Sequence, residues 1–135
     1  MTRRGWLASA LLMAGCAKSG PPRGNLLPDM VGAQWRRTSL AELPLTGLAQ
    51  PLTASTVKRA LAAKYDGPGK LEATLYEMSS SAAALDAVQR WRPEANTIFF
   101  YRDEFFVVVH YEPGDRQALN AFVRDLSAYL GPKKQ

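Results

Sequence analysis

The alternation of hydrophobic and polar residues predicts a first β-hairpin in the middle of the chain. Leu71, Ala73 and Leu75 alternate with polar or larger residues, a period of two that is typical of a strand with one buried face. Residues 57–65 precede them across the turn-forming sequence of residues 66–69. Residues 57–65 also have high helix propensity, but the neighbouring strand and turn favour a hairpin.

A second hairpin is predicted further along the chain, and a leading strand is predicted near the beginning of the domain. Residues 96–101 and 105–112 are rich in β-branched and aromatic side chains, and the link between them is polar. Residues 33–39 are expected to form the leading strand. Residues 41–53 contain several leucines and two prolines without clear periodicity, so we expect an irregular connection there.

Two segments have the spacing of amphipathic helices. The serines at 79–81 can cap the first helix, and Pro93 ends it. Residues 113–115 introduce the second helix, which Gly131 and Pro132 end. The predicted buried residues are Ala84, Leu85, Val88 and Trp91 in the first helix and Leu119, Phe122, Val123, Leu126 and Leu130 in the second.

These elements predict an α+β fold in the order β-ββα-ββα: a leading strand, a hairpin, a helix, a second hairpin and a second helix. The simplest architecture is one mainly antiparallel sheet with both helices on one face. Residues 25–132 form this single domain, and residues 133–135 are a short tail.

The first 15 residues have the pattern of an export signal. Arg3 and Arg4 precede an uncharged apolar run of nine residues, Trp6–Ala14. A helix needs roughly 20 apolar residues to cross a bilayer, so this run predicts a signal peptide and not a permanent membrane span.

Leu12, Met13, Ala14 and Gly15, at the end of this run, lead directly to Cys16, the only cysteine in the chain. This sequence resembles the lipobox of bacterial lipoproteins. The resemblance implies that the first four guide recognition and cleavage and that lipid is attached to Cys16. A lone thiol in an oxidising compartment is a liability that acylation removes.

The resemblance also implies a location. Residue 17 is Ala and not Asp, which implies delivery to the outer membrane, facing the periplasm, with the inner membrane as the alternative. Residues 16–24 are rich in Gly and Pro and predict a flexible tether. Export by the general secretory route is favoured, but the sequence of residues 2–7 partly resembles a twin-arginine signal, and both routes stay open.

Charge argues against nucleic acid as a partner. The formal charge of +5 falls to +3 once the two leader arginines are removed, because 15 basic residues then face 12 acidic ones. The basic residues are scattered singly or in pairs, whereas a phosphate-binding surface needs them clustered.

Few residues offer chemistry. His110 is the only histidine and Cys16 is the only cysteine, so neither a histidine pair nor a multi-cysteine cluster can hold a metal. The acidic residues are dispersed, the serines at 79–81 lack a nucleophile-elbow context, and no Gly-rich phosphate loop follows a strand. We therefore expect no catalytic residue, no metal and no cofactor, and we expect that the protein is not an enzyme.

The aromatic residues of the second hairpin are the remaining candidate for function. If the helices cover one face only, Phe100, Phe106, Val108 and His110 would lie near an exposed apolar strip that suits an envelope protein partner. The alternative is a strand buried on both sides, by the helices and by residues 26–53. The prediction is a lipid-anchored, non-catalytic interaction or structural module of the cell envelope. A carrier of a small apolar ligand is second, and a small hydrolase is third.

The mature domain also contains several short motifs: Leu26–Gly32 followed by Trp35, then Tyr65–Gly69, Leu75–Met78 with a Ser/Ala-rich helix start, and Phe105–Val109. Through these motifs it is similar to a family of uncharacterised bacterial envelope proteins known only as a domain of unknown function. The similarity covers residues 26–130 and implies an envelope location, with no substrate and no catalytic residue.

Overall fold

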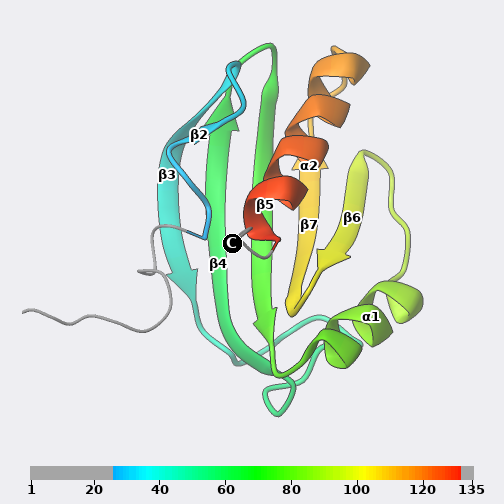
Figure 1. The fold of residues 1–135 in the computed structure, drawn as a ribbon. Helices are drawn as coiled ribbons and strands as arrows, with labels where there is room; N and C mark the ends of the chain where they lie inside the picture. Colours follow the sequence, from blue (N-terminus) through cyan, green and yellow to red (C-terminus); the bar gives the residue numbers. More distant parts are fainter. Residues whose placement is uncertain (1–25, 132–135) are drawn as a thin grey trace, which may run out of the picture.

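A computed structural model describes residues 26–131 as an antiparallel β-sheet with two α-helices (Figure 1). The six strands lie in the order β2-β3-β4-β5-β7-β6, and every neighbouring pair is antiparallel. The elements are β2 (Met30–Val31), β3 (Trp35–Leu43), β4 (Val57–Asp66), β5 (Lys70–Met78), α1 (Ser81–Arg90), β6 (Thr97–Arg102), β7 (Phe105–Tyr111) and α2 (Arg116–Leu130). The predicted α+β class with a mainly antiparallel sheet is confirmed.

Both predicted hairpins form. Strands β4 and β5 pair from Val57↔Met78 to Asp66↔Lys70, and the turn is closed by a hydrogen bond from Gly67 N to Gly69 O of 2.9 Å. Strands β6 and β7 are joined by a two-residue link in which Asp103 has a φ of 52°, a left-handed conformation that Asp tolerates better than most residues. The polar links that interrupt the apolar pattern are thus the turns.

Each helix begins at a capping side chain. The hydroxyl of Ser80 accepts a hydrogen bond from Ala83 N at 3.1 Å, and the carboxylate of Asp115 accepts one from Ala118 N at 3.0 Å. Both caps satisfy a backbone N–H that the first helical turn leaves without a partner.

Helix α2 covers one face of the sheet, which we call the first face. Figure 1 shows it crossing in front of β5 and β7. Its apolar stripe packs on alternate residues of the strands, such as Leu75 in β5 and Val107 in β7, and on Leu26 and Leu27 ahead of β2. The buried residues of α2 are Ala118, Leu119, Phe122, Leu126 and Leu130. The predicted stripe is confirmed, with Val123 partly buried and Ala118 added.

Helix α1 packs on the opposite, second face, and this corrects the prediction that both helices share one face. Its Ala84 and Ala87 join a separate apolar cluster with Phe106 and Val108, whose side chains point away from α2. Residues between β3 and β4, including Leu52, complete the cover. The strand β7 is apolar at both odd and even positions because each set meets a different helix.

Two smaller predictions also change. In α1, Ala84 and Ala87 are buried and Val88 and Trp91 pack against the same apolar cluster. Leu85 is 38% exposed, so the predicted helical face is correct except that Ala87 takes the place of Leu85. Strand β3 extends to Leu43, which takes the first residues of the expected irregular segment 41–53 into the sheet. The predicted signal peptide, the tether before the domain and the tail 133–135 lie outside the described residues.

Candidate functional site

Half of the second face is polar, and no helix or strand of residues 26–131 packs over it. Strand register places Ser39, Lys64, Glu72, His110 and Thr97 in one row that crosses five strands. In the next row, Arg36 faces Asp66 and Asp66 faces Lys70, while Glu112 lies beside Lys70 through a 3.0 Å backbone hydrogen bond. We call these two rows the polar half-face.

The polar half-face contains a shallow depression of about 500 Å³. Lys64, Asp66, Lys70, Glu72 and His110 contribute to its lining. Charges of opposite sign are neighbours in both rows, which favours the folded pairing of the strands. The ion pair between Lys70 and Asp66 is 3.6 Å long with both side chains more than half exposed, so it adds little stability.

His110 is exposed on this surface, and its ring is held by a neighbouring hydroxyl. Its Nδ1 lies 3.2 Å from the Thr97 hydroxyl, which donates its own hydrogen to the carbonyl of Ala95 at 3.1 Å. Because a hydroxyl carries one hydrogen, both contacts are satisfied when Nδ1 holds the proton and donates to Thr97. The exposed imidazole then presents Nε2 as a hydrogen-bond acceptor.

This geometry does not assemble a recognisable catalytic group. Glu72 is the cross-strand neighbour of His110, but no carboxylate in residues 26–131 is hydrogen-bonded to the imidazole. Over the same residues, no group of three or more metal-ligating side chains is close enough to hold an ion, and no charged side chain is buried. The polar half-face therefore presents hydrogen-bond donors and acceptors, on side chains of both charges, at the surface of the sheet.

The four residues predicted as an interaction face are not brought together. Phe106 and Val108 are 0% and 2% exposed beneath α1 and the segment before β4, while Phe100 packs against the first-face core. His110 alone is exposed. As the alternative expected, Phe106–Val109 of β7 are buried on both sides, but each side is covered by one helix together with part of residues 26–53.

Sequence reasoning missed the polar half-face itself. Its signal was present in the even-numbered residues Lys64, Asp66, Lys70 and Glu72, which are charged at every position flanking the first turn. The sequence alone led us to regard these charges only as scattered basic and dispersed acidic residues. The polar rows extend across the sheet only because β7 pairs with β5, which a single sequence does not reveal.

Cys16 and the residues that precede it lie outside the described part of the chain. Within residues 26–131, neither helix is long and apolar enough to span a bilayer.

Comparisons with protein-family models, with curated proteins and with solved structures found no significant match. The similarity to an envelope family therefore stays a prediction, and function is argued from the residues.

Proposed function

We propose that this protein is a lipid-anchored, non-enzymatic interaction module of the bacterial cell envelope, held at its membrane by acyl chains on Cys16. The observation that carries the proposal is the amino-terminal sequence. Two arginines, nine apolar residues and the small pair Ala14–Gly15 lead directly to the only cysteine. More than one acyl chain gives stable anchoring where a single chain does not.

The start of the folded domain suits a short tether. Leu26 and Leu27 are 4% and 0% exposed, so the domain begins at once after the Gly- and Pro-rich segment. Nine residues, 17–25, separate Cys16 from Leu26, and a fully extended chain of that length reaches about 30 Å. The proposed anchor would keep the domain close to the headgroups.

An interaction role is favoured over a carrier for small apolar ligands. The spaces on both sides of the sheet are occupied by large side chains such as Tyr65, Phe106 and Phe122, each 0% exposed. The depressions described in residues 26–131 open at the surface and have charged side chains in their lining. The polar half-face, with both signs of charge on a rigid sheet, suits a protein partner with complementary charges.

Metabolic labelling with an alkyne fatty acid tests the anchor. We expect the wild-type chain to incorporate the probe and the Cys16→Ser chain to incorporate none, because the thiol is the attachment atom. The variant should also keep its leader, which mass spectrometry would detect. Equal labelling of the two chains would refute the proposal.

Photo-crosslinking in the host tests the partner surface. A crosslinking amino acid at Lys64 or Ser39, on the polar half-face, should capture a discrete envelope protein. The matched control is Asn120, which is also exposed but lies on α2 on the opposite side of the sheet. Capture from Asn120 alone would place the contact on α2 and remove the polar half-face from the proposal.

A further inference from the structure

A second depression lies at the far end of α1, between two segments that are distant in sequence. Residues 49–53 form one wall and residues 90–94 contribute the other, around a space of about 680 Å³. This volume falls within the range of small-ligand sites. We call it the Trp91 groove, defined by Gln50, Pro51, Thr53, Trp91, Arg92 and Glu94.

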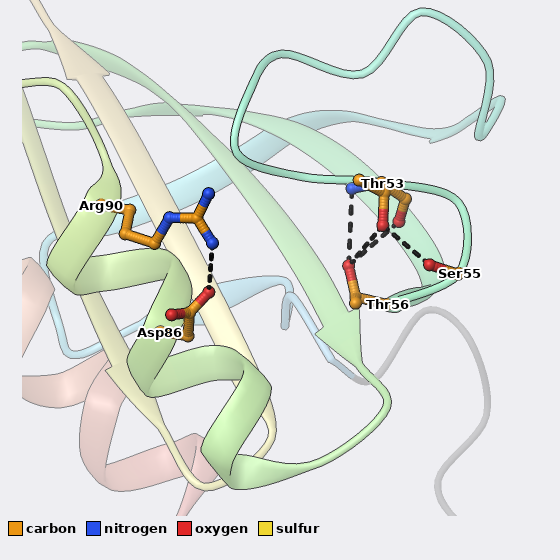
Figure 2. Close-up of polar contacts among 5 residues, drawn as sticks. All are labelled: Thr53, Ser55, Thr56, Asp86 and Arg90. Atoms are coloured by element: carbon orange, nitrogen blue, oxygen red, sulfur yellow. Dashed lines mark hydrogen bonds and ion pairs between the residues drawn. The ribbon is translucent and has the colours of Figure 1, made fainter.

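Both walls of the Trp91 groove are fixed by the fold. Leu52 is 4% exposed, and its N–H donates to Ala49 O at 2.9 Å. The hydroxyl of Thr53 lies 3.0 Å from that of Ser55 and 3.1 Å from that of Thr56, as Figure 2 shows. The opposite wall starts where α1 ends.

Trp91 gives the groove a partly apolar floor with one unused donor. Its ring packs edge-on against Phe106, with centroids 5.1 Å apart, and the residue also lines the groove. Among residues 26–131, the indole N–H of Trp35 donates to Ala118 O at 3.0 Å, but that of Trp91 has no hydrogen-bond partner. Tyrosine and tryptophan side chains with one apolar and one wet side are common where ligands bind.

The polar rim carries charges that cancel. Arg90 is held by Asp86 at 3.1 Å, and in Figure 2 its guanidinium extends from α1 on the side of Thr53. Arg92 and Glu94 are exposed and have no ion-pair partner among the described residues. With Gln50 and Thr53, the rim offers several donors and several acceptors without net charge. That balance suits a neutral ligand rich in hydroxyl groups and disfavours an anion.

We propose that the Trp91 groove binds a neutral oligosaccharide. The apolar C–H face of a pyranose ring would lie against Trp91 and Pro51, while its hydroxyls donate to Glu94 and accept from Arg92 and the indole N–H. Glycans are present throughout a cell envelope, so this site would add a carbohydrate contact to the proposed envelope role. Binding in solution is independent of lipid attachment, so the two proposals can fail separately.

Calorimetric titration of the full-length chain tests the site, with chitotetraose and maltotetraose as probes. We expect saturable binding of at least one, with Arg92→Ala and Trp91→Phe each weakening it about fivefold, the effect of one lost hydrogen bond. Trp91→Phe keeps a ring against Phe106, and thermal unfolding would verify that both variants fold. Arg36→Ala, on the polar half-face, is the matched control and should bind as the wild type does.

Three outcomes would overturn the inference. The first is failure of both sugars to bind the folded chain. The second is binding that Arg36→Ala weakens as much as Arg92→Ala does. The third is tight binding of a hexaglutamate peptide in place of either sugar, which would identify an anion site.

Discussion

Tyr65 joins the start of the domain to its centre. The ring is fully buried, lies edge-on to Phe122 with centroids 5.1 Å apart, and donates its hydroxyl hydrogen to Pro28 O at 2.7 Å. Burial disfavours the phenolate and raises the pKa of Tyr65 above its ordinary value, and the nearby Arg37 guanidinium offsets only part of this rise. Deprotonation of this side chain is therefore less favourable in the folded chain than in the unfolded chain.

This pKa shift predicts a loss of stability in alkali. Above about pH 10 the unfolded chain releases the Tyr65 proton and the folded chain keeps it, so the free energy of unfolding falls as pH rises. Below about pH 10 both states hold the proton, and this contribution is constant. Tyr65→Phe should cost about 1 kcal/mol at pH 7 by removing the hydrogen bond to Pro28, but should lose less stability between pH 9 and 11.

Urea denaturation at several pH values would measure both effects. Burial also raises the pKa of Tyr76, so the variant should keep some alkaline sensitivity. Identical alkaline losses in the wild type and Tyr65→Phe would contradict the assignment.

At the scale of elements, the β4–β5 turn packs closely on the loop that precedes β3. A side chain at Gly67 would meet the carbonyl oxygen of Gln34 and come within 3.2 Å of the Trp35 ring. Backbone cannot move aside as a flexible side chain can, so the absence of a side chain at residue 67 is what permits this approach.

Gly67→Ala should therefore lower the free energy of unfolding by about 1–3 kcal/mol, as overpacking does. Gly69→Ala in the same turn is the control, because its new methyl would find its nearest neighbour, Trp35, at 4.0 Å. Chemical denaturation of both variants would check the difference. Equal stabilities would mean that the turn adjusts freely.

Elements defined by local patterns were predicted, while their arrangement in space was not. The alternation in β5 and the turn at residues 66–69 identified the first hairpin, and the cap at Ser80 lies within the predicted serines. The face occupied by α1 depends on which side of β7 it meets, and a helix rich in alanine gives a weak apolar stripe. Leu85 was for that reason assigned to the core in place of Ala87.

The candidate site depended even more on tertiary pairing. His110 was correctly grouped on one side of β7 with Phe106 and Val108, because strand periodicity fixes side-chain direction. Phe100 was grouped with the wrong side because its direction follows from the β6–β7 register, Phe100↔Val107. The Trp91 groove joins residues about 40 positions apart, and no local signal connects them.

At the scale of the whole molecule, two apolar cores share one sheet. Val107 and Val109 face the first core, and Phe106 and Val108 face the second, so β7 is common to both. Neither core can come apart without exposing one side of β7. This shared strand should make residues 26–131 unfold as one cooperative unit.

The tryptophans provide a direct test, since Trp35 lies in the first core and Trp91 lies beside the second. Two single-tryptophan variants would be made, in which Trp6 and either Trp35 or Trp91 are replaced by phenylalanine. In each variant, the unfolding transitions followed by fluorescence and by circular dichroism should coincide. A fluorescence midpoint displaced from the circular-dichroism midpoint in either chain would indicate that the two cores open separately.

The entry of residues 26–29 into the domain determines where a mechanical load on the preceding chain would fall. The carbonyl of Leu27 accepts a hydrogen bond from the Arg37 guanidinium, and that of Pro28 accepts one from the Tyr65 hydroxyl. Arg37 and Tyr65 belong to the adjacent strands β3 and β4. A pull toward the amino terminus would thus be shared between two strands before any one of them could peel away. With the proposed lipid anchor, these two hydrogen bonds would resist a pulling force at the end of the domain nearest the membrane.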